Sequence, residues 1–517
     1  MEHERQPRAA EPAQQLGLPD AGARDAAMRL RALALCTLAS VVAVACSDDP
    51  PAGTTTAAGS TGAAGAGGTA ASSGSGGSGG NGGSSTGEGG GSNPDEKVVL
   101  TLVSPLPGLA FERRHVDVDV AFSVPEGGAT LRLALGEAIT DEQSIDTTVT
   151  TGTARLRLPR VRGANVFVVT IVSASGKTST VEGNLHGGRL VTTSIDTMFA
   201  LRDGTLVQWG GGDPTPAKKD APTALVSVAE NGDTLFALDA EGHVFKAPGG
   251  PSAFEPVPGL EDIAAIAPGG GHALFLRADG RLFAAGLNNR GQLGTGDTES
   301  HAGVVEVPLD GIVAIAASDD ASFAVDTKGL VHAWGSNDEG QLGLGDEDAS
   351  PHPDPLIVPN LVDIVDVAAG RDHVLALTAA GGLYAWGLGS SGQLGDGSAG
   401  ILASKPQPVP LVLPGPAIAL GARGNTSHVV LASGEHLVWG QNSLAQLGVG
   451  DTNLRTKPTP SLLGHVRAIS AGLTGGVAVD ESGGLQAWGS NTSGQLGLPL
   501  PPEGPERSSI PVVVPWP

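Results

Sequence analysis

The sequence predicts an all-β protein, and three observations support this. From about residue 97 onward, apolar runs of four to seven residues alternate with turns rich in Gly, Asp and Asn, whereas helices usually need ten or more residues. A unit built on Trp-Gly and Gly-Gln-Leu-Gly recurs through residues 187–517, and runs of alternating apolar and polar side chains recur through residues 97–186. Together these patterns predict a seven-bladed β-propeller preceded by a small β-sandwich.

The count of seven comes from the repeated Trp-Gly element. Five copies are well preserved, and two weaker copies have Lys246-Ala247 and Ala285-Gly286 in its place, with successive intervals of 37 to 53 residues. The well-preserved copies begin at Trp209, Trp334, Trp386, Trp439 and Trp488. Four short strands in each of seven units is the arithmetic of a propeller, and the period excludes most helical solenoids.

Within one unit, each apolar run predicts one strand. The fifth unit has runs at 364–370, 373–378 and 383–387, and Pro-spaced runs such as 356–359 fit an edge strand. Dipeptides that contain glycine, such as Lys328-Gly329, fit the tight hairpins between runs. In the Gly-Gln-Leu-Gly loops we expect the Leu to fill the space between neighbouring sheets while the Gln amide bonds to backbone. The Gln positions are Gln292, Gln341, Gln393, Gln446 and Gln495.

These units resemble a known repeat family. Ala-Gly-x-x-His-x-Leu-Ala-Leu, Gly-x-x-Tyr-x-Trp-Gly and Gly-Gln-Leu-Gly are similar to the regulator of chromosome condensation repeats, whose members form seven-bladed propellers. The resemblance covers residues 187–517, and the first two units depart from it because they lack the Gly-Gln-Leu-Gly element. It implies that the Trp and Gln positions are scaffold and that variable loops carry any binding.

The two ends of the repeat region predict how the ring closes. The first unit begins near residue 190 without a preceding Pro-spaced strand, and the chain ends in the apolar run 510–515. We expect that terminal run to join the sheet that begins near residue 190, because this would remove two free sheet edges.

Residues 97–186 predict a separate small domain. Runs such as 116–122, 130–135 and 165–171 alternate with a period of two, which is typical of half-buried strands. The segment 162–176 resembles the penultimate strand and hairpin of bacterial immunoglobulin-like modules. The resemblance implies an immunoglobulin-like β-sandwich.

The N-terminus predicts export. Residues 1–45 form a signal region in which two arginines precede an apolar core of about fourteen residues and then small residues. Met28 stands where such a signal usually starts, so we expect it to be the true initiator. Cys46 follows Ala43-Val44-Ala45, which is similar to a bacterial lipoprotein signal and implies lipidation of Cys46. An ordinary cleaved signal would leave the protein exported without an anchor, in the periplasm or secreted.

Residues 46–96 predict a flexible tether. The stretch is almost entirely Gly, Ser, Thr and Ala, which cannot bury a core. About 40 such residues span on the order of 35 Å, so we expect the folded part to stand clear of an outer-membrane or cell-surface anchor.

Composition limits the partners and cofactors. The net charge is −24 and the sequence has no Lys/Arg cluster of the kind that binds phosphate backbones, so we expect no nucleic acid partner. Cys36 and Cys46 are the only cysteines and both lie at the N-terminus, so the folded part has no disulfide and no zinc held by Cys. We expect a monomer without a cofactor, in contact with a membrane through its anchor only.

The residues suggest no catalytic centre or metal site. His272 and His373 occupy the same repeat position, but other units have Ala321, Thr426 and Gly475 there, so a structural hydrogen bond is favoured over a ring of imidazoles. Asp297, Asp346 and Asp451 lack the spacing of a calcium loop, which favours turn caps. Outside the Gly/Ser-rich tether there is no Gly-x-Ser-x-Gly element for nucleophilic catalysis.

Three functions follow. The favoured one is an exported, lipid-anchored scaffold, not an enzyme, whose propeller loops bind a protein or surface polymer. The alternative is an extracellular hydrolase or lyase with its site in the propeller channel, which convergent acids or histidines there would favour. The third and least favoured is guanine-nucleotide exchange, because the resembled family includes a nucleotide-exchange factor, but exchange requires a cytosolic or nuclear GTPase that an exported protein would not meet. The family also includes an inhibitor of β-lactamase, whose contact residues have no match in this chain.

Overall fold

The computed structural model describes residues 98–104, 110–111, 115–124, 128–135, 138–146, 148–159, 163–250, 253–480 and 482–517. Every regular element within these ranges is a strand, which confirms the all-β prediction. Among these residues there is no helix long and apolar enough to span a membrane. The predicted signal region and tether, including Met28 and Cys46, lie outside the described residues.

The first eight strands form two sheets that share one core. Their alternating pattern buries one face of each sheet, including Val118, Leu131, Leu156 and Phe167, all fully buried. The three-stranded sheet has the order β1 (Val99–Ser104), β3 (His115–Ser123), β6 (Thr151–Pro159). The five-stranded sheet has the order β2 (Ala110–Phe111), β8 (Thr178–Gly187), β7 (Gly163–Ser173), β4 (Ala129–Leu135), β5 (Ala138–Ile145).

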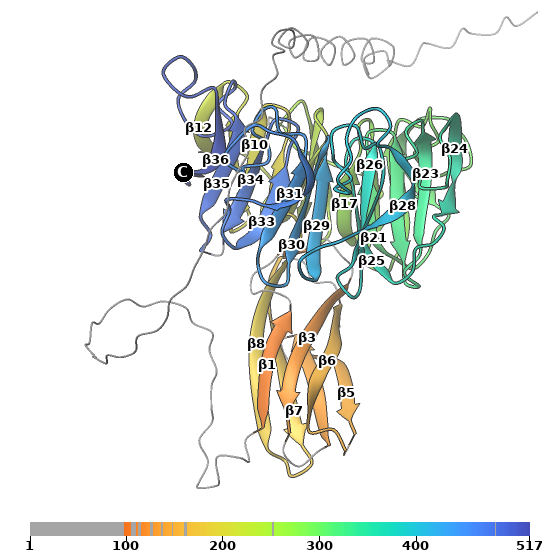
Figure 1. Cartoon of the computed structure of the whole chain (residues 1–517), viewed down its shortest axis with the longest axis vertical. Coiled ribbons are helices and arrows are strands. Elements are labelled where there is room, and N and C mark those ends of the chain that lie inside the picture. Colours follow the sequence, from red (N-terminus) through yellow and green to blue (C-terminus); the bar gives the residue numbers. More distant parts are fainter. Residues whose placement is uncertain are drawn as a thin grey trace, which may run out of the picture. The chain divides into compact units, whose positions relative to one another are not determined.

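In the described part of residues 187–517, the strands form seven four-stranded antiparallel sheets (Figure 1). We call them sheets one to seven and call their strands A to D in chain order. Sheet one contains β9 (Val191–Thr193), β10 (Thr197–Arg202), β11 (Thr205–Gly210) and β12 (Asp213–Lys218). Sheet two contains β13 (Leu225–Glu230), β14 (Thr234–Asp239), β15 (Val244–Pro248) and β16 (Glu255–Pro256). Sheet three contains β17 (Ile263–Pro268), β18 (His272–Arg277), β19 (Leu282–Gly286) and β20 (His301–Val307).

The remaining four sheets repeat the same order. Sheet four contains β21 (Ile312–Ala317), β22 (Ala321–Asp326), β23 (Val331–Asn337) and β24 (Asp348–Ile357). Sheet five contains β25 (Ile364–Ala369), β26 (His373–Thr378), β27 (Leu383–Gly387) and β28 (Lys405–Leu411). Sheet six contains β29 (Ala417–Arg423), β30 (Thr426–Leu431), β31 (His436–Gly440) and β32 (Arg455–Pro460). Sheet seven contains β33 (Val466–Ala471), β34 (Gly475–Asp480), β35 (Leu485–Ser490) and β36 (Arg507–Val514).

The A strands form a closed cycle. Each A strand contacts the A strand of the next sheet, and β33 of sheet seven contacts β9 of sheet one. One apolar cluster joins sheets seven, one and two, and includes Val477, Met198 and Leu235. The innermost strands therefore surround a central channel, and the two ends of the repeat region meet in one core.

The predicted route of ring closure is wrong. The C-terminal strand β36 pairs with β35 of its own sheet, with Val512 opposite Ala487, and does not enter sheet one. Sheet one obtains its D strand from β12, the Pro-containing segment that directly follows Trp209. Each sheet is thus built from consecutive strands, and closure depends on contacts between sheets instead of a shared strand.

The repeat motif contributes a hydrogen bond at five of the seven interfaces between sheets. Each indole Nε1 donates a hydrogen bond to the main-chain carbonyl of the loop Gln in the preceding sheet, at 2.8–3.0 Å. The pairs are Trp209 with Gln495, Trp334 with Gln292, Trp386 with Gln341, Trp439 with Gln393, and Trp488 with Gln446. The Gln side-chain oxygen accepts from the backbone N two residues earlier; for example, Arg290 N donates to Gln292 Oε1 at 2.8 Å. Leu293 of the same loop is fully buried.

Glycine is required where this loop meets the indole. Gly395 has φ +75°, and a Cβ there would lie 2.7 Å from Trp439 Nε1. In four of the five copies the final Gly of the loop therefore packs directly against the Trp of the next unit, whereas Gly497 faces Val514. One register assignment also changes: Ala247, opposite Leu235, occupies the Trp position of sheet two, and Lys246 precedes it.

Candidate functional site

Both kinds of variable loop gather at one end of the seven sheets. In an antiparallel sheet of consecutive strands, the A–B and C–D turns lie at the same end. This end, which we call the loop end, carries A–B loops such as 318–320 and C–D loops such as 388–404. The B–C turns and the D-to-A connections lie at the opposite end. The loop end is where residues outside the repeat pattern can form a site.

An ion pair links sheets two and six at the loop end. Arg423 ends the A strand of sheet six, and Glu230 ends the A strand of sheet two. Arg423 Nη2 lies 3.1 Å from Glu230 Oε2, and Arg423 Nη1 donates to the Glu230 carbonyl oxygen at 2.7 Å. These sheets are not neighbours in the cycle of A strands, so the pair bridges the channel. Burial raises the pKa of Glu230 to about 7, although Arg423 opposes the shift.

A second group of charged side chains lies at the loop end of sheets four and five. Arg371 Nε lies 3.6 Å from Asp319 Oδ2 and 3.4 Å from Asp372 Oδ2. Burial raises the pKa of Asp372 to about 7 while Arg371 opposes it, and the nearby Asp319 and Glu339 raise it further. Burial also raises the pKa of Asp319, while Arg371 and Arg423 oppose the shift. Acidic groups therefore converge around two arginines at the channel end.

The sequence alone did not predict this network, although two repeat positions have charged residues where other units have small ones. Glu230 stands where other units have Pro268, Ala317, Ala369 or Ala471, and Arg423 stands where they have Gly or Ser. A charged residue in a strand-end position otherwise filled by small side chains marks a departure from the scaffold. Pairing between the two could not be deduced, because 193 residues separate them.

The two repeat histidines hold neighbouring sheets together. His272 Nε2 lies 2.8 Å from Ser322 Oγ, and that hydroxyl donates to the Gln292 carbonyl at 2.8 Å. His373 repeats the arrangement with Ser427 Oγ at 2.7 Å. Both rings are buried, and burial lowers the pKa of His272 to about 4 and of His373 to about 3. These neutral rings are structural, as the sequence favoured.

The acids that follow the repeat motif cap turns. Asp297 Oδ1 accepts from the backbone N of Glu299 at 3.1 Å and from Asn288 Nδ2 at 2.9 Å. Asp451 accepts from the backbone N of Asn453 at 2.9 Å. Asp346 contributes its main-chain carbonyl, which accepts from Asn337 Nδ2 at 3.1 Å. The side chains of Asp297 and Asp451 thus cap turns, whereas Asp346 takes part through its main chain.

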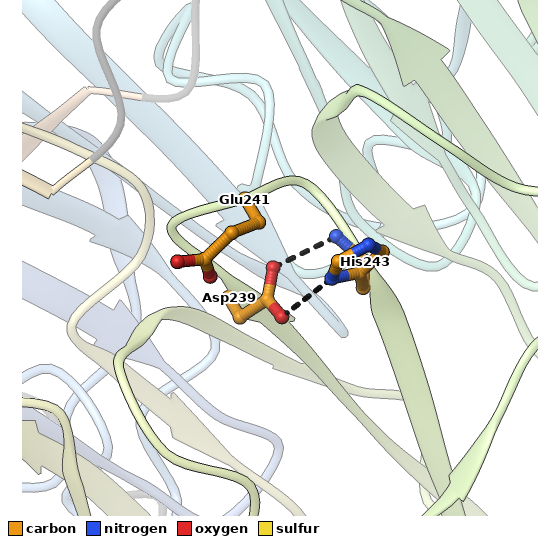
Figure 2. A group of neighbouring side chains, drawn as sticks. All are labelled: Asp239, Glu241 and His243. Atoms are coloured by element: carbon orange, nitrogen blue, oxygen red, sulfur yellow. Dashed lines mark hydrogen bonds and ion pairs between the residues drawn. The ribbon is translucent and has the colours of Figure 1, made fainter.

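One acidic group at the opposite end has the composition of a cation site. Asp239, Glu241 and His243 place their ligand atoms within 4.8 Å of one another (Figure 2). Asp239, however, accepts from His243 N at 2.8 Å and lies 2.9 Å from His243 Nδ1. Asp326 and Asp480 cap the matching turns of sheets four and seven in the same way, so the carboxylate of Asp239 is explained by its turn.

Comparison with known proteins defines the family. Residues 231–516, more than half of the chain, match the model of the RCC1-like domain, and the chain therefore belongs to the RCC1-like domain family. It is 41% identical over 244 residues to the human probable E3 ubiquitin-protein ligase HERC3, which covers 46% of this chain and 23% of that protein. It is 36% identical over 267 residues to the mouse secretion-regulating guanine nucleotide exchange factor, which covers 47% of this chain and 55% of that protein.

The chain thus spans about a quarter of the first relative and about half of the second. Among solved structures it is similar to yeast RCC1 (Prp20) bound to Kap60, with a TM-score of 0.53 and 20% identity over 63% of this chain and 85% of that one. It is also similar to human WBSCR16, with a TM-score of 0.50 and 24% identity over 59% of this chain and 86% of that one. These likenesses show the fold, an RCC1-type β-propeller.

Proposed function

We propose that the chain is an exported, lipid-anchored scaffold that binds another protein through its loop end. The observation that carries this proposal is the contrast within each unit: the recognisable Trp, Gln and His positions are buried between sheets, while the loop end presents charged and exposed aliphatic residues. Ile195 and Leu473 are 54% and 41% exposed there. Family membership supports a binding role, since the similar yeast protein was solved with Kap60 and another structure of it is described by its binding to Gsp1p and histones.

In this proposal the seven sheets are the seven blades of one propeller spanning residues 187–517. Residues 97–186 are an immunoglobulin-like sandwich that joins the propeller to the tether at 46–96. The shared core of the two N-terminal sheets and the closed cycle of A strands support this division.

The proposed localisation depends on residues 1–46. We propose that translation begins at Met28, that Cys46 is lipidated and that the chain resides at the outer membrane or cell surface. The test is detergent-phase partitioning and intact mass of the membrane fraction for Cys46→Ser, with Cys36→Ser as the matched control inside the signal. Only Cys46→Ser should release the protein. Equal behaviour of both variants would contradict lipidation and leave a periplasmic or secreted protein.

Binding is tested by capture from envelope extracts on the immobilised full chain, followed by mass spectrometry. We expect one protein to be recovered in stoichiometric amount. Free chain added to the extract should compete with the immobilised chain for it. If capture recovers nothing and the purified protein turns over a glycan or peptide panel, the binding proposal is wrong.

The acidic cluster favours one alternative, a hydrolase or lyase acting outside the cell. Glu230 and Asp372 have pKa values near 7, which suits proton transfer at neutral pH. Both carboxyls, however, face an arginine. Turnover of a glycan or peptide by the native chain, abolished in Glu230→Gln, would support this alternative.

Likeness to the mouse exchange factor favours a second alternative, nucleotide exchange on a small GTPase. It conflicts with the proposed export. Accelerated release of a fluorescent guanine nucleotide from a GTPase of the same cell would support it.

A further inference from the structure

Two large aliphatic side chains are held out at the loop end of sheet five. Ile401 and Leu402 are 94% and 91% exposed. They occupy the central positions of a turn in which Ala403 N donates to the Gly400 carbonyl at 3.1 Å. Gly400 N in turn donates to the Ser390 carbonyl at 2.9 Å, and Ala403 is buried. The turn is therefore anchored on both sides, and its tip is pinned outward.

This tip is unusual in composition, and its loop is longer than the corresponding loops of sheets three and four. Central turn positions usually hold Gly, Pro, Asn, Asp or Ser, which tolerate the backbone and the solvent. Sheets three and four reach their D strands within a few residues of Gly296 and Gly345, whereas sheet five runs from the equivalent Gly397 to Lys405. The C–D loop of sheet seven, 491–506, is similarly long. In sheet five the added residues carry the exposed pair.

The loops at this end of sheets three to five are acidic, although the basic Lys405 follows the tip and Lys457 of sheet six lies beside Gly397. The loops at the loop end of sheets three to five, at 269–271, 287–300, 318–320, 338–347, 370–372 and 388–404, contain ten acidic residues and two basic ones. Both arginines are already engaged, Arg290 with Asp338 at 3.1 Å and Arg371 with Asp319 at 3.6 Å. The acidic side chains affect one another, since burial and the neighbouring Glu347 and Asp338 raise the pKa of Glu339.

The opposite end of the same three sheets is nearly balanced in charge. Its turns and connections, at 278–281, 308–311, 327–330, 358–363, 379–382 and 412–416, contain three acidic and two basic residues. It also presents exposed aliphatic residues, Val362 at 65% and Val412 at 94%. Exposed apolar groups therefore occur at both ends, but they combine with an excess of negative charge at the loop end.

We propose that the loop end of sheets three to five docks a basic amphipathic segment of a partner protein, whose apolar face covers Ile401 and Leu402 and whose Lys and Arg side chains meet the loop acids. An anionic lipid surface would bring its own negative charge against these loops, so the charge disfavours a membrane. This inference rests on the proposed protein-binding function and adds the face and the chemistry of the partner.

The test measures binding of labelled 20-residue peptides to the full chain by fluorescence anisotropy at several salt concentrations. The probes are a Lys/Leu amphipathic helix, the same pattern in Glu/Leu, and the same charges in Lys/Ser. Two pairs of variants supply matched controls: Ile401→Ser/Leu402→Ser against Val362→Ser/Val412→Ser, and Asp346→Asn/Glu347→Gln against Asp310→Asn/Asp363→Asn. Each comparison sets two apolar or two acidic side chains removed at the loop end against two of the same kind removed at the opposite end.

We expect the Lys/Leu peptide to bind tightest, with a dissociation constant that rises at least tenfold in Ile401→Ser/Leu402→Ser and severalfold in Asp346→Asn/Glu347→Gln. The matched controls should stay within twofold, with thermal melting confirming that all four variants fold. Equal losses in the two apolar pairs, or Lys/Ser binding as tightly as Lys/Leu, would overturn the proposal. So would binding to phosphatidylglycerol/phosphatidylethanolamine vesicles that depends on Ile401 and Leu402.

Failure here is distinguishable from failure of the proposed function. A partner captured from envelope extracts that Ile401→Ser/Leu402→Ser retains and Val362→Ser/Val412→Ser loses would leave protein binding in place and refute this face. Capture of the same partner only by chains with Ile401 and Leu402 intact would support both.

Discussion

The indole Nε1 of Trp209 donates a hydrogen bond of 2.8 Å to the main-chain carbonyl of Gln495, across 286 residues of sequence. This bond is one of five equivalent Trp–Gln contacts, but it alone among them joins sheet one to sheet seven. Because no strand is exchanged between these sheets, the seam relies on this bond, on Gly212 N donating to the Ser493 carbonyl at 2.9 Å, and on the shared apolar core.

Trp209→Phe should therefore weaken the seam. Removing the donor leaves the buried Gln495 carbonyl without its partner, which costs about 1–3 kcal/mol in the free energy of unfolding. Urea denaturation measures the loss, and hydrogen exchange should show faster exchange in sheets one and seven. Trp386→Phe, at an interior interface, is the control for local exchange. A loss below about 0.5 kcal/mol would mean that the bond is not a significant part of the seam.

Truncation after Pro505 should prevent stable folding. It removes β36, uncovers the edge of β35 and deletes the buried Val514. It also removes Trp516, whose Nε1 donates to the Gly483 carbonyl at 2.8 Å and whose ring lies 5.3 Å from the guanidinium carbon of Arg202 in sheet one. We expect aggregation in light scattering. Trp516→Ala alone should remain folded with a lower melting temperature.

Buried histidines should make the propeller sensitive to acid. His373 has a folded pKa of about 3, against about 6.5 when unfolded, so only the unfolded chain gains a proton between these values. Stability is then present above pH 6.5 and is lost as the pH falls toward 3, by up to about 1.4 kcal/mol per pH unit for one such group. His373→Gln should flatten this slope in denaturation measured from pH 7 to 4.

The control for this slope is His352→Asn. His352 is half-buried and lies 3.0 Å from Asp348 Oδ2, so its replacement should not flatten the profile in the same way. Parallel profiles for wild type and His373→Gln would contradict the prediction.

Glu230 should produce the opposite trend. Its folded pKa of about 7 exceeds the usual 4.5, so the folded chain retains a proton that the unfolded chain has lost, and stability falls as the pH rises from 4.5 to 7. Glu230→Gln removes this contribution. Its free energy of unfolding should therefore rise more steeply with pH than that of the wild type over this window, as measured by urea denaturation. A steeper fall would show that the sign is wrong.

Arg423→Met should destabilise the channel end. It leaves the buried Glu230 carboxyl unpaired, at a cost of about 1–3 kcal/mol. The matched control is Arg281→Met, which breaks the exposed pair with Glu306 and should cost under about 1 kcal/mol. Equal effects in thermal unfolding would mean that the bridge between sheets two and six contributes no more than a surface pair.

The sequence alone determined the class of fold and the nature of the repeat. Period-two patterning, short apolar runs and the recurrence of Trp-Gly and Gly-Gln-Leu-Gly depend on neighbouring residues along the chain, so they could be recognised without coordinates. The buried Leu293 and the Gln292 loop bond follow from such local chemistry. So does the structural role of His272, because its repeat position varies from unit to unit.

The tertiary structure decided what is non-local. Assigning β36 to sheet seven, pairing Trp209 with Gln495 and bringing Arg423 to Glu230 all depend on how the ring of sheets closes. The sequence pattern led to the wrong sheet, the one that begins near residue 190, because backbone hydrogen bonds to its edge would satisfy the terminal strand as well as those to sheet seven. Packing of Val514 into the core shared by sheets seven and one settled that choice, and the same closure placed the acidic loops and Ile401 at one end.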